Sequence, residues 1–196
     1  MKRALPWVLG VVILTAVLVV GLSQAGSKTD DAPPAPTEAY DLEAAKRKLA
    51  GAPAPLAALH EQSSELLEGG VPAFKQRLAE LEGTPVVINK WASWCGPCRA
   101  EFPAFQALAT ERGKEIAFLG VNAHDATNDA RDFLEEYPIP FPSYVDPDEK
   151  IAREIKAPAN YPITVFVDAQ GKTAFIHQGG YTSADQLAAD VEQYLG

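Results

Sequence analysis

The only two cysteines of the 196-residue chain, Cys95 and Cys98, lie three positions apart in the stretch WASWCGPCRAEFP. A strand is predicted before this stretch and a helix after it. Both sulfurs then lie on the first turn of the helix, where they can form a disulfide without large strain. Such a bond closes a loop too short to stabilise the fold much by restricting the unfolded chain. The spacing therefore indicates a redox pair rather than a structural disulfide.

The start of a helix gives the two sulfurs different chemistry. Free backbone N–H groups and the positive end of the helix dipole favour a thiolate at Cys95. Pro97 suits a first-turn position, which has no amide hydrogen bond to lose, and Gly96 leaves the approach to the sulfur open. We therefore expect Cys95 to be the nucleophile and Cys98 to be the more shielded, resolving cysteine.

A metal site is the alternative use of a cysteine pair. Zinc takes about four ligands. Beyond the cysteines the chain offers only three histidines, none of them close to the pair in sequence: His60, His124 and His177. The only methionine is Met1, so soft ligands for copper are also lacking. These counts favour no metal, and we expect no other cofactor.

The hydrophobic pattern predicts the elements that position the pair. Near-continuous apolar runs indicate buried strands, and stretches with a helical period separate them. Strands are predicted at 85–93, at 115–123 and twice within 162–180, and helices at 97–112, 128–137 and 183–195. Strands that alternate with helices and end in a hairpin and a helix indicate an α/β fold, with a mixed central sheet and helices on both faces.

Residues 41–83 are predicted to form a helical N-terminal extension that precedes a domain at 84–196. One helix is predicted to run through Leu67, because apolar or small residues recur at helical spacing at Leu56, Leu59, Ser63, Leu66 and Leu67. Gly69-Gly70 ends this helix, and a second helix follows at 71–83. Its apolar face is formed by Phe74, Leu78 and Leu81.

Residues 1–22 are predicted to be a signal-anchor transmembrane segment. The run Ala4–Leu22 contains no charged residue, and at roughly 1.5 Å per residue it approaches the roughly 30 Å thickness of a bilayer core. Lys2 and Arg3 precede this run, which predicts that the rest of the chain lies outside the cytoplasm. The alternative is a signal peptide cleaved after Ala25, which would give a secreted protein.

The segment that follows the anchor is polar and acidic. Residues 23–40 are small, polar and Pro-rich, and we expect a flexible linker.

The part of the chain predicted to be exported is acidic. Without Lys2 and Arg3, 15 basic residues remain in the chain against 26 acidic ones, which gives a net charge of −11. This balance argues against nucleic acid as a partner, because phosphate binding needs a basic surface. Solubility is the simpler explanation of the acidity.

The stretch WASWCGPCRAEFP resembles the active site of the thioredoxin superfamily, and most closely that of TlpA/ResA-type membrane-anchored thiol-disulfide oxidoreductases. The resemblance covers roughly Thr84 to Gly196. It implies a thioredoxin-like fold, a redox dithiol, an extracytoplasmic location and a cis-proline loop that faces the dithiol. Tyr161-Pro162, which precedes the strand ITVFVD, is the candidate for this loop. The alternative is an ordinary trans proline at the start of a strand.

The resemblance also assigns a substrate-binding surface around the cysteines. The Tyr161 backbone is expected to lie against the sulfurs and to pair with an extended segment of the substrate. Trp94 is expected to cover the site and to offer an apolar rim, whereas Trp91 fits core packing better. The residues expected to contact substrate are thus Trp94, Gly96, Pro97, Tyr161 and Pro162.

A departure from thioredoxin concerns the residue that handles protons. Thioredoxin has a buried aspartate six residues before its first cysteine, and this chain has Asn89 there. TlpA/ResA-type proteins instead place a glutamate three residues after the second cysteine, which is Glu101 here. The resemblance implies that Glu101 accepts the proton of Cys98, and the alternative is a surface charge at the start of the helix. His124, just past a predicted strand, is either a further acid/base or an ordinary loop histidine.

These observations predict a thiol-disulfide oxidoreductase that acts on disulfide-containing protein substrates. The resemblance favours disulfide reduction, with apocytochrome c as one substrate class, and implies a membrane electron donor or thiol-exchange partner. The sequence does not set the direction of electron flow, which depends on the reduction potential. A disulfide-forming oxidase of the same fold and a non-catalytic docking or metal-binding module are the alternatives.

The anchor prediction can be tested by cell fractionation. Full-length protein is expected in the membrane fraction and should stay there through an alkaline carbonate wash, since Ala4–Leu22 is long enough to span the bilayer. A soluble extracytoplasmic protein whose first residue is Gly26 would contradict the anchor, although not the export.

Overall fold

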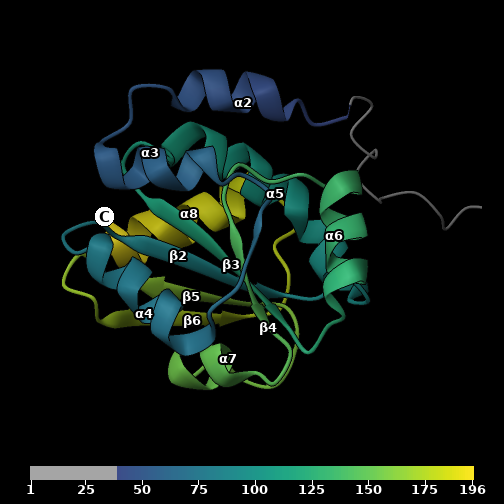
Figure 1. Cartoon of the computed structure of the whole chain (residues 1–196). Coiled ribbons are helices and arrows are strands. Elements are labelled where there is room, and N and C mark those ends of the chain that lie inside the picture. Colours follow the sequence, from purple (N-terminus) through teal and green to yellow (C-terminus); the bar gives the residue numbers. More distant parts are fainter. Residues whose placement is uncertain (1–38) are drawn as a thin grey trace, which may run out of the picture. The chain divides into compact units, whose positions relative to one another are not determined.

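A six-stranded mixed sheet forms the centre of the fold, with strand order β1-β4-β3-β2-β5-β6 (Figure 1). The strands are β1 Leu66–Leu67, β2 Val86–Trp91, β3 Ala117–Ala123, β4 Ser143–Asp146, β5 Ile163–Val167 and β6 Thr173–Gln178. Strands β1 to β4 pair parallel with one another, in the order β1-β4-β3-β2. Strand β5 pairs antiparallel with both β2 and β6. The predicted mixed sheet is confirmed.

Helices cover both faces of this sheet (Figure 1). Their bounds are α2 Leu42–Leu49, α3 Ala54–Glu61, α4 Gly70–Glu80, α5 Gly96–Arg112, α6 Thr127–Glu136, α7 Lys150–Glu154 and α8 Ala184–Leu195. Helices α5, α6 and α8 bury apolar side chains in one core cluster, which includes Phe102, Phe133 and Leu187. Helices α3, α4 and α7 bury theirs in a second cluster, and α2 packs against α5 and α3. Ser183 caps α8, since its hydroxyl accepts from the Gln186 N–H.

The computed structural model describes residues 39–196, of which Tyr40–Gly196 form one compact unit. The predicted anchor at 1–22 and nearly all of the predicted linker at 23–40 lie outside the described residues. Within residues 39–196, no helix has both the length and the apolar character needed to cross a bilayer.

The prediction of one helix through Leu67 is wrong. Helix α3 ends at Glu61, and Ser64 takes a left-handed φ of 60°. The Ser64 N–H donates to the Phe141 carbonyl at 3.1 Å, which brings the following residues alongside β4. Leu66 and Leu67 then pack against opposite core clusters. A two-residue strand that is partly buried on both faces has no alternation, so the sequence pattern did not separate it from a helix.

Strand β4 and helix α7 lie in a proline-rich stretch whose pattern predicts neither element. All four residues of β4 are buried between β1 and β3. The Ala152 N–H in α7 donates to the carboxylate of Asp146 at 2.9 Å, so the end of β4 fixes the position of α7. Elements this short carry too few residues to show a period.

Trp91 fixes the end of the strand that leads into the cysteine motif. The side chain is fully buried, as predicted, with its ring stacked on Phe133 at 5.1 Å between centroids. Its indole N–H donates to the hydroxyl of Ser143 at 3.1 Å. This bond passes over Gly120 on β3, where a side chain would overlap the Ser143 hydroxyl. The sheet thus holds the last residue of β2 rigidly, four positions before Cys95.

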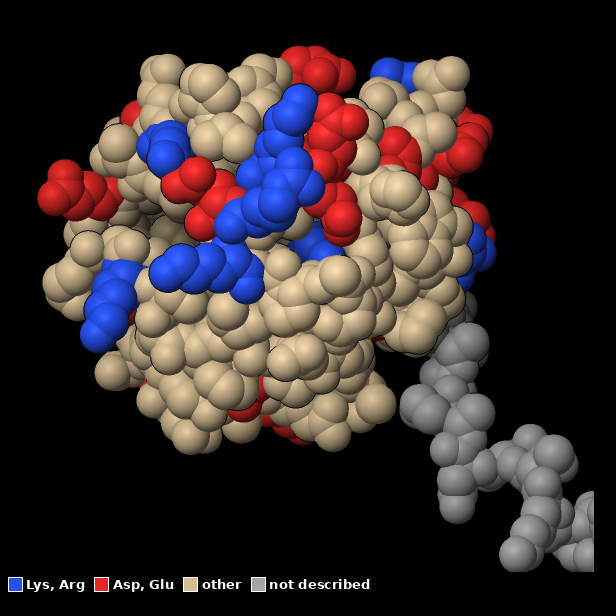
Figure 2. Space-filling view, turned by 90° about the horizontal axis from the view of Figure 1, so that it is seen from below, with Lys and Arg blue, Asp and Glu red and all other residues tan. Residues whose placement is uncertain are grey.

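Lys and Arg side chains lie beside Asp and Glu side chains on the face seen from below (Figure 2). Helices α4 and α7, at the bottom of Figure 1, are joined there by an ion pair of 2.7 Å between Lys75 and Glu154. Lys150 pairs with Asp148 at the same distance, 2.7 Å. The charged part of this face is therefore mixed in sign, and the rest of it is largely uncharged (Figure 2).

Candidate active site

The cysteine motif forms the junction between β2 and α5. Cys95 is the N-cap of α5, with extended backbone angles, and its sulfur accepts from the Cys98 N–H at 3.1 Å. Pro97 lies in the first turn, where it has no hydrogen bond to lose. The two sulfurs form a disulfide, with their Cα atoms 5.3 Å apart. The predicted pairing at a helix N-terminus is confirmed.

The two cysteines differ little in exposure in this disulfide form. Cys98 is fully buried, and Cys95 is 4% exposed. The predicted order of shielding holds, but Cys95 presents only an edge of its sulfur to solvent. A reaction partner must therefore come close to the motif to reach this atom.

Glu101 is fully buried one helical turn beyond Cys98. Its Oε1 accepts from the Asn89 side-chain amide at 2.7 Å, and its Oε2 accepts from the Tyr181 N–H at 3.3 Å. Burial raises the pKa of this carboxyl to about 8, although both hydrogen bonds act in the opposite direction. The alternative of a surface charge is wrong, and Glu101 can hold or release a proton near neutral pH.

Gly180 is a site residue that sequence reasoning missed. A Cβ built there would lie 3.3 Å from the Pro97 carbonyl oxygen, 3.7 Å from the Pro162 ring and 3.8 Å from Glu101 Oε2. The start of α5, the proline loop and the buried acid therefore meet around one residue that has no side chain. Nothing in the local sequence signals this close approach, because Pro162 and the two residues of α5 lie far from Gly180 along the chain.

The Tyr161-Pro162 peptide bond is cis, as predicted. The Tyr161 ring lies 5.0 Å from the ring of Trp94, so the loop lies beside the cysteine motif. Trp94 is 57% exposed, and it is the only large hydrophobic side chain among residues 39–196 that is exposed. Its indole N–H donates to the His124 carbonyl at 2.9 Å, and the His124 ring lies edge-on to the Trp94 ring at 6.5 Å between centroids. Trp94 and Tyr161 together form an aromatic rim at the disulfide.

Asp125 is the second residue that the sequence did not single out. Its carboxylate accepts from the Ser93 N–H at 2.6 Å and from the Ser93 hydroxyl at 2.8 Å. It also accepts from the side-chain amide of Asn122 at 2.8 Å. The loop after β3 thereby holds the chain two residues before Cys95, and a carboxylate in a loop gives no sequence signal of this role.

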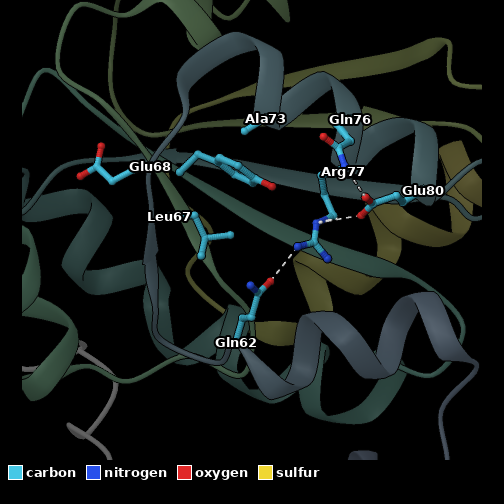
Figure 3. Close-up of a pocket in the computed structure, with 8 residues that line it drawn as sticks. Gln62, Leu67, Glu68, Ala73, Gln76, Arg77 and Glu80 are labelled. Carbon is cyan, nitrogen blue, oxygen red and sulfur yellow. Dashed lines mark hydrogen bonds and ion pairs between the residues drawn. The ribbon is translucent and has the colours of Figure 1, made fainter.

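A hollow of about 250 Å³ lies between α4, β1 and the end of α3, and it shares no lining residue with the cysteine motif (Figure 3). Its polar side chains pair with one another: Arg77 donates to Gln62 at 2.7 Å, and Gln76 donates to Glu80 at 3.0 Å (Figure 3). Among residues 39–196, no group of three or more His, Cys, Asp or Glu side chains is arranged to hold a metal ion.

Comparison with known proteins places this geometry in a family. The family model described as AhpC/TSA family matches residues 51–176. The chain belongs to the AhpC/TSA family. The AhpC/TSA match spans both cysteines, Glu101 and Pro162, and the resemblance inferred from the motif is confirmed.

Relatives of this AhpC/TSA chain carry names from thiol-disulfide chemistry. It is 30% identical to the thiol:disulfide interchange protein DsbE of Xylella fastidiosa, over 88% of this chain and 76% of the relative. It is 33% identical to the thiol-disulfide oxidoreductase ResA of Oceanobacillus iheyensis, over 54% of this chain and 55% of the relative. The chain thus spans about half the length of that ResA.

A solved structure confirms the thioredoxin-like fold. A protein from Chlorobium tepidum, named as a thiol:disulfide interchange protein DsbE, superposes with a TM-score of 0.55 and 30% identity. The match covers 61% of this chain and 85% of that one.

Replacing Glu101 by Gln is expected to change how the free energy of unfolding depends on pH. In the unfolded chain a glutamate titrates near 4.5, whereas the pKa of folded Glu101 is about 8. Between these values the folded protein holds a proton that the unfolded chain has released. Stability therefore falls as pH rises, with a slope that approaches about 1.4 kcal/mol per pH unit.

Urea denaturation at several pH values from about 5 to about 7.5 measures this slope. The wild-type protein should lose stability relative to Glu101→Gln across this range. Parallel curves for the two proteins would contradict a buried carboxyl that is neutral in the folded state.

Proposed function

We propose that this chain is a membrane-tethered, extracytoplasmic thiol-disulfide oxidoreductase that reduces disulfides in other proteins. One observation carries the proposal: the Cys95–Cys98 disulfide lies at a helix N-terminus, next to an exposed aromatic rim and a cis-proline loop. The names of the relatives support the same chemistry. The reducing direction follows from the Gly-Pro pair between the cysteines, which the resemblance associates with reducing thioredoxins.

The proposed reaction begins with the reduced dithiol. The Cys95 thiolate, stabilised by the start of α5, attacks one sulfur of the substrate disulfide. A mixed disulfide forms, and the other substrate sulfur leaves as a thiolate. The Cys98 sulfur then attacks the sulfur of Cys95 and displaces the second substrate thiolate. Two electrons have passed to the substrate, and the chain is left with its own disulfide.

Glu101 is proposed to take the proton of Cys98 in the second step. Cys98 is fully buried, so water has poor access to its thiol. With a pKa of about 8, Glu101 is mostly neutral near pH 7, but a minor carboxylate fraction is present one helical turn away and can accept the proton. Asn89 cannot accept this proton, but it holds the Glu101 carboxyl in place.

Two partners follow from this reaction. Substrates are disulfide-containing proteins, and apocytochrome c before haem attachment is one class that the resemblance suggests. A membrane electron donor or thiol-exchange protein must return two electrons to the Cys95–Cys98 disulfide after each cycle. Both partners form mixed disulfides with Cys95, so one trapping experiment can recover either.

Cys98→Ser is expected to accumulate mixed disulfides, because Cys95 can still attack but nothing resolves the product. Cys95→Ser is the matched control, since it removes the attacking sulfur and leaves the resolving one. Non-reducing gels and mass spectrometry of the trapped species would identify the partners. Equal trapping by both variants would contradict the division of roles, and failure of the wild-type protein to reduce insulin would contradict the proposed function.

Glu101→Gln is expected to slow the resolving step more than the first attack. General-base catalysis is worth roughly 10²- to 10⁴-fold, and we expect the low end because a pKa of about 8 leaves only a minor fraction of Glu101 as carboxylate near pH 7. Stopped-flow reduction of a model disulfide across pH, with wild type, Glu101→Gln and Asn89→Asp, separates the two steps. If Glu101→Gln keeps both the wild-type rate and its pH profile, the proton goes elsewhere, and His124 is the next residue to test.

A further inference from the structure

Lys90 is a fully buried lysine in the central strand β2. Its ammonium donates to the Pro158 carbonyl at 2.5 Å and lies 3.5 Å from Glu149 Oε1. Burial lowers the pKa of Lys90, and the nearby Glu149 carboxylate acts against this effect. Replacing a buried ion pair by apolar side chains is often neutral or stabilising, so stability alone gives no reason for a charge at this position.

The ammonium of Lys90 faces the ring of Tyr161, at 4.0 Å from the ring centroid. This distance is well within the range of a cation–π interaction. The Tyr161 hydroxyl donates to Glu149 Oε1 at 2.7 Å and lies 3.1 Å from the Ala123 carbonyl oxygen. Lys90 and Glu149 therefore hold the Tyr161 side chain from its face and from its tip.

Tyr161 links Lys90 and Glu149 to the rim of the active site. Its ring packs against the indole of Trp94 with 5.0 Å between centroids. Its backbone precedes Pro162, which lies near the start of α5 around Gly180. A change in the position of the Tyr161 ring must therefore reach both the exposed rim and the backbone beside the disulfide.

We propose that Lys90, together with Glu149, is a positioning residue for the surface that binds a protein substrate. The ammonium fixes the Tyr161 ring, and the ring in turn fixes Trp94 and the loop backbone against which an extended substrate segment lies. Lys90 does not touch the reacting sulfurs. This inference rests on the proposed function, because it assigns the surface on which that function acts.

The Lys75–Glu154 pair provides a matched control. Like the Lys90–Glu149 pair, it joins a lysine to a glutamate at α7: Glu154 lies in the helix, 2.7 Å from Lys75, and Glu149 is the residue before the helix. The Lys75 side chain is 57% exposed, whereas that of Lys90 is buried. Within residues 39–196, the Lys75–Glu154 pair contacts neither Tyr161 nor Trp94, so neutralising it tests loss of a lysine charge alone.

The first test compares Lys90→Met and Lys75→Met in the full-length protein, with dithiothreitol as electron donor. A methionine fills the space of the lysine stem, and the Glu149 side chain is 28% exposed, so its carboxylate keeps access to water and Lys90→Met should remain folded. We expect its KM for insulin to rise about fivefold, because this factor corresponds to the free energy of one cation–π contact. Its KM for 2-hydroxyethyl disulfide should change less, because a small disulfide reaches the sulfur without covering the rim. Lys75→Met should behave as wild type with both substrates.

The second test reads the rim directly and needs no activity. The indole N–H resonance of Trp94 in a ¹⁵N spectrum should shift in Lys90→Met, because the Tyr161 ring is released, and should not shift in Lys75→Met. Tyr161→Phe keeps the ring beside Trp94 and loses only the hydrogen bond to Glu149. We therefore expect a smaller shift of the Trp94 resonance than in Lys90→Met. If Lys90→Met fails to fold, Glu149→Gln can be examined in the same two tests, because Glu149 is partly exposed and its replacement disturbs the core less.

The outcomes separate this inference from the function on which it rests. An unchanged KM for insulin, equal changes for both substrates, or an unmoved Trp94 resonance would overturn the role of Lys90 while the activity stands. Absence of insulin reduction by the wild-type protein would instead overturn the proposed function, and the Trp94 resonance would still report whether Lys90 positions the rim.

Discussion

Strand β2 is covered by helices on both faces, so every polar side chain on it must find its partners inside the protein. Successive side chains of a strand point to opposite faces. Asn89 therefore meets Glu101 below α5, and Lys90 meets Glu149 and Tyr161 on the other face. The two neighbouring residues thus support the buried acid and the aromatic rim, and the cysteine motif follows directly after them.

The electrostatics of the site depend on keeping charges apart. The start of α5 favours negative charge on the sulfur of Cys95. A second negative charge one turn into the same helix would oppose it. Because burial keeps Glu101 largely neutral at physiological pH, this repulsion is small when Cys95 attacks. The carboxyl then becomes useful at the moment when the Cys98 thiol must lose its proton.

Much of the site could be predicted because its signals are local. The spacing of Cys95 and Cys98, the apolar run before them and Pro97 after them together indicate a strand, a turn and a redox pair. The likeness to a known family added Glu101 and Pro162, whose contacts cross the fold. The direction of the reaction and the anchor at 1–22 remain predictions, the latter because those residues are outside the described part of the chain.

The residues that could not be predicted act through contacts between distant segments. Lys90 looks like a surface residue until Glu149, 59 positions away, is placed beside it. Gly180 has no side chain to signal its role, and Asp125 resembles any acidic loop residue. Strand β1 exists only because β4 offers it a neighbour, and two leucines carry no period that would separate a strand from a helix.

Strand β1 also decides where the chain can be shortened. It covers the outer edge of β4 with residues that precede the cysteine motif by almost thirty positions. A fragment that began at Thr84 would leave the outer edge of β4 unpaired and would uncover Tyr144, which packs edge-on against Phe74 of α4 at 5.3 Å. An unpaired apolar edge invites aggregation. A soluble fragment should therefore keep the chain from Tyr40 onward, whose hydroxyl is bonded to Thr110 of α5 at 2.7 Å.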